Sequence, residues 1–204
     1  ANQWQGLPKN GYSYWLREMV SGIPVMLESS NYIIPFYYKD WDIVISTAPI
    51  DIMLGYKFGK LQYRSLRFDY KVDEQWENDS YGTINLPQHE KYIRKANFKI
   101  LHRQESEHNF IQYQEPVEPG KPWDEDNKPM YPINTEENNK IFDKYLKEIC
   151  KTNTLPTGRL GLFKYLDMDK AIQLSFDMVK LVENYLSLSP IKRYNLIKHI
   201  RNKY

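Results

Sequence analysis

The amino-acid sequence predicts an α+β or mixed α/β fold, in which an antiparallel-rich sheet is followed by carboxy-terminal helices. Two patterns lead to this prediction. Apolar and polar residues alternate through the middle of the 204-residue chain, which is typical of strands with one buried face. The last third instead places apolar residues at helical spacing behind capping residues. Strands first and helices later, in this order along the chain, indicate this fold class.

The first third is expected to form a helix over residues 11–20 and a strand over residues 23–27. Residues 42–46 are a short apolar run between turn residues, as a buried strand of a mixed sheet would be. A helix is then expected to begin within residues 47–51. Pro49 lies there at an early helical position, where its missing N–H is harmless.

The middle of the chain carries the alternating pattern. It predicts strands over residues 61–72, 81–86, 97–101 and 109–113. Residues 116–132 follow with five prolines and several acidic residues, and this composition predicts a loop.

Three helices are expected in the last third. The first begins behind Thr135 and runs to about Cys150, with acidic residues favourably placed in its first turn. The second begins at Asp167 or Asp169, and the third begins at Ser189 and is basic. A basic terminal helix can touch anionic membranes or nucleic acid, but a solvated tail is the more common outcome and is expected here.

Composition narrows the function classes only a little. A net charge of +2 and a pI near 8.4 are too balanced to indicate nucleic acid by themselves. No run approaches the roughly 18 apolar residues of a membrane span, and the first residues show no secretory pattern. The lone Cys150 excludes an internal disulfide, fits a reducing compartment and is expected to be a half-buried structural thiol. We therefore expect a cytoplasmic protein with no nucleic-acid partner and no membrane span.

Tyrosine is the unusual residue, with 17 copies in the chain. Its ring is apolar and its tip forms hydrogen bonds, which suits carbohydrate and nucleotide surfaces. Ordinary core and surface tyrosines explain the number equally well, so both interpretations stay open.

Four short motifs follow one another along the chain. They are Gln5-Gly6-Leu7-Pro8 with Gly11-Tyr12; Ala48-Pro49-Ile50-Asp51 running to Gly59-Lys60-Leu61-Gln62-Tyr63-Arg64-Ser65-Leu66; Tyr131-Pro132-Ile133-Asn134 with Asn138; and Gly158-Arg159-Leu160 followed by Tyr165, Asp167 and Met168. In this order they resemble the UDP-galactopyranose mutase family. The resemblance runs from residue 4 to about residue 180, but it covers only about the second half of a typical member.

The resemblance implies a part of a flavin-binding mutase fold. Family members are flavin-dependent isomerases that interconvert the pyranose and furanose forms of UDP-galactose, with reduced FAD as the nucleophile and UDP as the leaving group. The chain contains no Gly-x-Gly-x-x-Gly fingerprint, the strand–turn–helix segment that holds the flavin pyrophosphate. We therefore expect an amino-terminal flavin-binding half as a partner, and an isolated chain that is inactive and does not retain FAD.

Two alternatives accompany this expectation. The chain can instead be a non-catalytic nucleotide-sugar-binding or assembly protein derived from the mutase, and a homo-oligomer stays open. Leu166 replaces a tyrosine that is usual in the family, and the neighbourhood of Arg94 diverges from it, so the nucleotide sugar can differ from UDP-galactose.

The resemblance also implies substrate-binding residues. Arg64 and Arg94 fall where the family places arginines that face the pyrophosphate, and Tyr131 and Tyr165 fall where tyrosine hydroxyls contact it. A leaving diphosphate requires fixed cations with bidentate donors, which arginine supplies. Trp4 falls where the family usually has a tyrosine near the sugar, and either ring can stack on a pyranose.

A second group of residues is implied on the flavin side. Arg159 resembles an arginine that contacts the flavin, and Gly158 allows close approach of the backbone. Asp167 and Met168 begin a helix whose amino terminus would favour negative charge on the reduced ring. The resemblance places no firm catalytic residue and no metal ligand in this chain.

The expected organisation has four parts. Residues 1–60 form part of the flavin and substrate core, and residues 61–134 form the antiparallel substrate region. Residues 135–188 form a helical segment on the flavin side, and residues 189–204 form the basic terminal helix.

Overall fold

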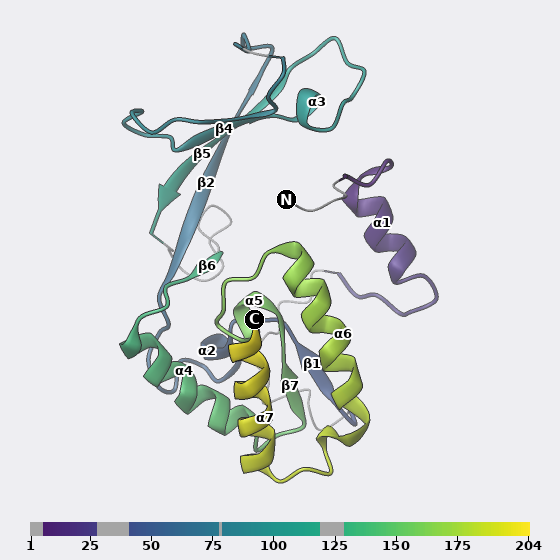
Figure 1. Ribbon diagram of the computed structural model, residues 1–204, viewed down its shortest axis with the longest axis vertical. Helices are drawn as coiled ribbons and strands as arrows, with labels where there is room; N and C mark the ends of the chain where they lie inside the picture. The colour runs from purple at the N-terminus through teal and green to yellow at the C-terminus, as the bar shows by residue number, and fades with distance from the viewer. Residues whose placement is uncertain (1–5, 28–40, 78, 119–128) are drawn as a thin grey trace. The chain divides into compact units, whose positions relative to one another are not determined.

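The computed structural model describes residues 6–27, 41–77, 79–118 and 129–204 (Figure 1). The chain divides into two compact units. Unit 1 consists of Ala1–Ser30 and Asp69–Tyr113, and unit 2 consists of Asn31–Phe68 and Gln114–Tyr204. Most of the residues predicted to bind substrate or cofactor therefore belong to unit 2.

The described residues of unit 1 include α1 (Gly11–Met19), β3 (Thr83–Asn85), β4 (Arg94–Asn97) and α3 (Phe98–Leu101). β3 pairs antiparallel with β4. Its small core gathers around Trp76, Ile111 and Tyr113. The helix predicted over residues 11–20 is confirmed as α1.

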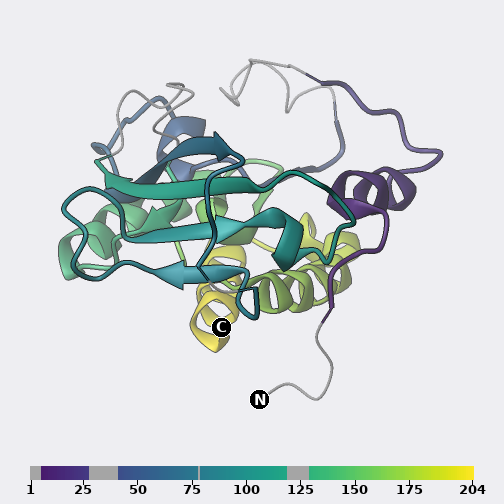
Figure 2. The ribbon, with the colours of Figure 1, turned by 90° about the horizontal axis from the view of Figure 1, so that it is seen from above.

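A five-stranded sheet has the order β3-β4-β5-β2-β6, and its longer strands lie side by side in Figure 2. Besides β3 and β4, the sheet contains β2 (Tyr63–Val72), β5 (Phe110–Val117) and β6 (Tyr131–Pro132). β2 pairs antiparallel with β6. The antiparallel-rich sheet that the alternating pattern predicted is confirmed.

Unit 2 carries most of the helices around a two-stranded parallel sheet. Its further elements are β1 (Val44–Ser46), α2 (Ile50–Met53), α4 (Glu136–Ile149), β7 (Thr154–Pro156), α5 (Gly158–Gly161), α6 (Met168–Tyr185) and α7 (Pro190–Lys203). The core includes Phe142, Tyr145 and Leu146 from α4, Leu155 from β7 and Leu174 from α6. The mixed α/β class with carboxy-terminal helices is therefore confirmed.

The predicted helix starts lie where the capping residues indicated. The Thr135 side chain accepts a hydrogen bond from the N–H of Asn138 at the start of α4. Pro49 is the N-cap residue of α2, Asp167 that of α6 and Ser189 that of α7. These positions confirm the sequence-based prediction of each helix.

Two predicted strands are wrong. Residues 23–27 form no strand; Ile23 donates to the carbonyl of Val20 in a turn, and the apolar side chains beyond it are exposed. Residues 98–101 form α3 instead, because the Asn97 side chain at the end of β4 accepts from the N–H of Lys99 and caps a helical turn. The short strands β4, β6 and β7 were not predicted. Residues 116–132 were predicted to be a loop, but β5 extends to Val117 and β6 occupies Tyr131–Pro132.

The expectation of a solvated terminal helix is also wrong. Arg193 and Arg201 are each only 9% exposed, and Ile197 and Ile200 are buried with them. Arg193 donates to the carbonyl groups of Tyr185, Leu186, Cys150 and Thr152. Two of the basic residues thus hold α7 to the core through backbone carbonyls.

Cys150 is fully buried rather than half-buried. Burial raises the pKa of its thiol to about 11, and hydrogen bonding to Tyr185 only partly opposes this shift. The thiol therefore stays protonated at neutral pH, which fits the structural role expected of it.

Candidate functional site

Arg64 and Tyr131 lie directly opposite each other in the antiparallel pair of β2 and β6. Opposite residues of such a pair direct their side chains to the same face of the sheet. The N–H of Met130 donates to the carbonyl of Arg64 at 3.1 Å and continues the contact beyond the two-residue strand. Arg64 is exposed and Tyr131 is half-buried. The structure thus brings these two predicted substrate residues together.

Arg159 lies against two predicted substrate tyrosines. Its guanidinium carbon is 5.3 Å from the ring centre of Tyr131 and 4.9 Å from that of Tyr165. The two rings are stacked on each other with their centres 5.8 Å apart. The guanidinium also donates to the carbonyl of Leu166 through Nε (3.1 Å) and Nη2 (2.5 Å). A cation held against aromatic rings in this way is a stabilising contact.

Tyr165 and Asp167 interact directly. The Tyr165 hydroxyl donates to the Asp167 carboxylate, and this hydrogen bond is the main cause that raises the pKa of Tyr165 above its ordinary value of 10.0. The nearby charge of Arg159 acts in the opposite direction. Tyr165 is 54% exposed, and its hydroxyl stays protonated at physiological pH with that proton directed to Asp167.

The sequence motif around Asp51 supports the strand that carries Arg64. Asp51 is 2% exposed, and its Oδ2 accepts from the N–H of Leu61 at 3.0 Å. Burial raises the pKa of Asp51, and the hydrogen bond from Leu61 partly opposes the shift. Tyr145 contacts the loop between α2 and β2, since its hydroxyl donates to the carbonyl of Gly59 and accepts from the N–H of Phe58. Sequence reasoning assigned neither side chain this role.

Asn138 links the two strands of the site. It is 3% exposed, and its Nδ2 donates to the carbonyl of Ile133 at 2.8 Å and to the Gln62 side chain at 3.1 Å. Ile133 follows β6 and Gln62 precedes β2. Asn138 belongs to the same motif as Tyr131, so its motif position was a signal for this role, although its partners could not be read from the sequence.

The short helix α5 positions Arg159. Gly158 has a φ of +72°, a conformation that favours glycine, and Thr47 lies 3.3 Å from where its Cβ would be. Gly161 is also constrained, because a Cβ there would lie 2.9 Å from the carbonyl oxygen of Ser46. The space beside Gly158 is therefore occupied by this chain's own Thr47.

The amino terminus of α6 lacks a side-chain cap. Asp167 occupies the N-cap position but accepts no hydrogen bond from the first turn, because its carboxylate is engaged with Tyr165. Met168, the first residue of α6, is 56% exposed. The first-turn N–H groups thus lack the acceptor that a capping aspartate usually supplies.

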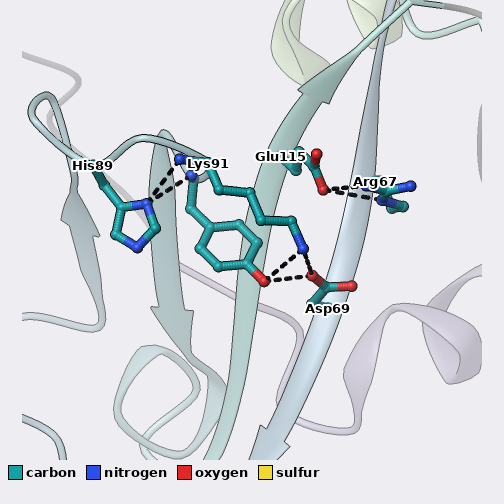
Figure 3. A network of polar contacts seen from close by, with 6 residues as sticks. Arg67, Asp69, His89, Lys91 and Glu115 are labelled. Atoms are coloured by element: carbon teal, nitrogen blue, oxygen red, sulfur yellow. Dashed lines mark hydrogen bonds and ion pairs between the residues drawn. The ribbon is translucent and has the colours of Figure 1, made fainter.

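Arg94 belongs to unit 1, whereas Arg159 and the two tyrosines that it contacts belong to unit 2. It is exposed at the start of β4, and its Nε donates to the Asn85 side chain at 3.2 Å. The loop before it is tied to β2, since Asp69 accepts from Lys91 (2.9 Å) and from the Tyr92 hydroxyl (2.5 Å) (Figure 3). Trp4 lies outside the described residues.

Glu115 forms an ion pair with Arg67 in unit 2. Its Oε2 accepts from Nε of Arg67 at 3.0 Å and from Nη2 at 2.6 Å (Figure 3). This arrangement gives Glu115 a structural contact with β2.

A pocket, metal ligation and membrane-spanning helices can each be assessed for the described residues. A pocket of about 390 Å³ in unit 2 has Asp51, Tyr63 and Ile133 in its lining, and none of the predicted site residues is among the described residues that line it. Within the described ranges, no three His, Cys, Asp or Glu side chains are placed to hold a metal ion. None of the helices described there combines the length and apolar character needed to cross a membrane.

Known proteins with similar sequences are nucleotide-sugar mutases. The UDP-galactopyranose mutase of Mycoplasma genitalium is 32% identical over 198 residues, covering 90% of this chain and 48% of that protein. The UDP-galactopyranose mutase of Mycoplasma pneumoniae is 33% identical over 189 residues, covering 84% of this chain and 46% of that protein. A dTDP-fucopyranose mutase of Escherichia coli is 26% identical over 192 residues, covering 88% of this chain and 49% of that protein. The chain spans about half the length of the curated relatives that it matches.

The family model described as UDP-galactopyranose mutase matches residues 1–165. The chain therefore belongs to the UDP-galactopyranose mutase family. The match includes Arg64, Tyr131, Arg159 and Tyr165, and it ends before Asp167.

The fold agrees with a solved member of the family. The crystal structure of reduced UDP-galactopyranose mutase superposes with a TM-score of 0.57 at 14% identity, covering 79% of this chain and 45% of that chain. At this identity the likeness establishes the shared fold.

Proposed function

We propose that this chain is the carboxy-terminal part of a flavin-dependent isomerase that interconverts the pyranose and furanose forms of a UDP-sugar. The observation that carries the proposal is the pairing of Arg64 with Tyr131 on one face of the β2–β6 pair, beside Tyr165. Family membership supplies the reaction, and this cluster supplies chemistry that suits its diphosphate.

On the substrate side, the diphosphate of a UDP-sugar carries negative charge that grows as it leaves the anomeric carbon. Arg64 offers a planar guanidinium with several donors, which suits a bidentate contact with phosphate oxygens. Tyr131 offers a hydroxyl donor. The Tyr165 hydroxyl donates to Asp167, so in the proposed role its single proton would turn from that carboxylate to a phosphate oxygen. Arg94 and Trp4 are proposed as substrate residues on the family resemblance alone.

On the cofactor side, the uncapped amino terminus of α6 fits the electron-rich edge of a reduced flavin, because free N–H groups there favour negative charge. Bound reduced FAD would supply the nucleophile for the anomeric carbon. Asp167 and Met168 would lie beside it at the helix start. Arg159 and Gly158 would form the neighbouring wall, with Arg159 holding Tyr131 and Tyr165 in place.

The choice of a UDP-sugar follows the relatives. The two proteins that are 32% and 33% identical carry the name UDP-galactopyranose mutase, whereas the dTDP-fucopyranose mutase is 26% identical. The diphosphate is common to both substrates, so the proposed roles of Arg64, Tyr131 and Tyr165 are the same in either case.

The test is an activity assay of the reconstituted enzyme. The chain is co-expressed with the part of the Mycoplasma genitalium mutase that it does not match, supplied with reduced FAD and UDP-galactopyranose, and the products are separated by chromatography. The proposal expects UDP-galactofuranose to appear, and none with the chain alone. A chain that binds UDP but gives no furanose in the reconstituted enzyme would instead support the non-catalytic nucleotide-sugar-binding alternative.

A further inference from the structure

Helices α4 and α7 of unit 2 lie beside each other (Figure 1) and line an open groove of about 440 Å³. We call it the α4–α7 groove. Its lining combines charged and apolar side chains: Lys144, Lys147, Glu148, Lys151, Phe58, Pro190, Ile191 and Tyr194. None of the residues proposed above for substrate or flavin is among the described residues that line it. The groove is therefore a separate surface feature that the proposed function does not use.

Positive charge is concentrated at this groove. Lys144, Lys147 and Lys151 are spaced by three and four residues, so they share one side of α4 and of the turn that follows it. Lys57 adds a fourth cation 3.6 Å from Glu148, and Lys151 donates to the same carboxylate at 2.6 Å. Four lysines thus surround one carboxylate, a surplus of three positive charges that exceeds the +2 of the whole chain. A surface of this kind attracts anionic partners.

Apolar side chains lie among these lysines. Ile191 is 59% exposed, and Phe58 and Tyr194 are half-buried. The Nζ of Lys57 is 5.3 Å from the ring centre of Phe58, and the Nζ of Lys147 is 5.4 Å from that of Tyr194. Lysine stems along apolar groups leave the charged ends in water. Proteins that bind at a membrane surface combine the same two features, apolar side chains that enter the interface and cations that attract anionic lipids.

The groove fits an extended anionic surface better than a single soluble anion. A site for one phosphate typically fixes its donors, as a bidentate arginine does. Here the described lining contains no arginine, and the side chains of Lys57 and Lys151 are 58% and 59% exposed. A nucleic acid backbone would satisfy the cations but would leave the exposed aliphatic side chain of Ile191 without an apolar partner. An anionic bilayer provides partners for both.

We propose that the α4–α7 groove attaches the protein peripherally to the surface of an anionic lipid bilayer. Ile191 enters the headgroup layer, and Lys144, Lys147 and Lys151 lie next to the lipid phosphates. The contact uses neither Arg64 nor Tyr131, so the proposal does not depend on the proposed function.

Vesicle flotation tests the charged part of this surface. The chain is mixed with vesicles of phosphatidylcholine alone, or of phosphatidylcholine and phosphatidylglycerol in equal parts. It is expected to float with the anionic vesicles only and to be released at about 0.5 M NaCl, because salt screens exposed charges. Lys147→Glu is expected to weaken binding about tenfold or more, since each lysine near an anionic surface contributes about fivefold. Lys170→Glu, which reverses an exposed lysine on α6, is the matched control and should change binding less than about twofold.

A second pair of variants tests the apolar part. Ile191→Gln leaves the charge unchanged and is expected to weaken binding about threefold or more, because it removes apolar contact with the headgroup layer. Ile172→Gln is its control, since Ile172 is an exposed isoleucine on α6 (43%) and should matter little. Circular dichroism verifies that each variant is folded, and Lys144→Glu replaces Lys147→Glu if that variant unfolds.

Several results would overturn the proposal. These are equal flotation with neutral and anionic vesicles, equal effects of Lys147→Glu and Lys170→Glu, and equal effects of Ile191→Gln and Ile172→Gln. Release by inorganic phosphate at constant ionic strength would identify a site for a single anion instead. Tighter binding to polyuridylate or polyglutamate than to vesicles, at equal concentrations of negative charge, would identify a nucleic acid or an acidic protein as the partner.

Discussion

Arg159 connects residues that the sequence assigned to two different groups. It was predicted on the flavin side, yet its guanidinium contacts the rings of Tyr131 and Tyr165 and the carbonyl of Leu166. Two of its contacts are therefore with residues proposed for the diphosphate. At the scale of single residues, the side chains of unit 2 that were predicted for substrate and for cofactor contact one another through Arg159.

The ionisation of Tyr165 is a direct reporter of this cluster. Its pKa lies above 10.0 because its hydroxyl donates to Asp167. Replacing the carboxylate by an amide in Asp167→Asn removes the negative charge that disfavours the tyrosinate. We expect the pKa of Tyr165 to fall in this variant, so that the tyrosinate forms at lower pH. NMR titration of ring-labelled tyrosine, assigned with Tyr165→Phe, measures the change.

Asp169→Asn is the control for this titration, because Asp169 lies two residues after Asp167 in the first turn of α6 and is not among the groups that shift the pKa of Tyr165. Its Tyr165 titration should match that of the unaltered chain. An unchanged pKa in Asp167→Asn would show that the hydrogen bond between Tyr165 and Asp167 does not form in solution.

Among the described strands, β6 is the shortest, and a side chain from α4 helps to hold it in place. Asn138 holds it to the start of β2 through two hydrogen bonds from one amide. In Asn138→Leu, the carbonyl of Ile133 keeps the hydrogen bond from the N–H of Thr135 but loses the one from Asn138, and the Gln62 side chain loses its bond as well. A typical hydrogen bond contributes about 0.5–1.5 kcal/mol, so the loss of the two costs about 1–3 kcal/mol. We expect the free energy of unfolding in urea to fall by that amount and the affinity for UDP to fall as well.

Asn139→Leu does not serve as the control, since Asn139 accepts from Arg201. Glu137→Gln does, because Glu137 is exposed in the same turn of α4. Its free energy of unfolding should stay within a few tenths of a kcal/mol of the unaltered value. An equal loss in both variants would remove the special role of Asn138.

Helix α7 supports the helix that carries Arg159. Arg201 donates to the carbonyls of Leu162 and Phe163, immediately after α5, at 2.7 and 3.0 Å. In Arg201→Met these buried carbonyls lose their donors, so we expect the free energy of unfolding to fall by about 1–3 kcal/mol. Urea denaturation measures the change.

Lys192→Met is the matched control for that variant, because Lys192 is exposed on the same helix. Its stability should be nearly unchanged. If Arg201→Met were as stable as Lys192→Met, α7 would be the solvated tail that composition suggested.

The elements also show which features the sequence could predict. Capping by Thr135 located α4, because its effect is local. Residues 97–101 misled the prediction, because the local capping by Asn97 outweighed their alternating pattern. The burial of Arg193 and Arg201 could not be predicted, since their carbonyl partners lie far away in the sequence.

The same distinction applies to the site. Motif resemblance indicated Arg64, Tyr131, Arg159 and Tyr165, and the structure groups them in unit 2. The support from Asp51 and Tyr145 depends on loop geometry, which no spacing in the sequence reveals. Arg94 lies in unit 1, so its proposed contact with the diphosphate remains a prediction.

At the scale of the whole molecule, the chain matches about half of the length of its relatives, and its sequence contains no glycine-rich fingerprint. One uncapped helix terminus and a neighbouring arginine give a flavin few contacts. We therefore expect the purified chain to be colourless, with no flavin absorbance after incubation with FAD and gel filtration. The complex with the complementing part of the Mycoplasma genitalium mutase should retain FAD. A yellow isolated chain with stoichiometric flavin would contradict this expectation.

The central claim is that Arg64 contributes to a diphosphate site, and a calorimetric titration of the reconstituted enzyme with UDP tests it most directly. Arg64→Ala should weaken UDP binding about tenfold or more, because a charge-assisted hydrogen bond contributes about 1.5–3 kcal/mol. Lys140→Ala, which removes an exposed cation on α4, should bind UDP as the unaltered enzyme does. UDP affinity that is the same in Arg64→Ala as in Lys140→Ala would contradict the claim.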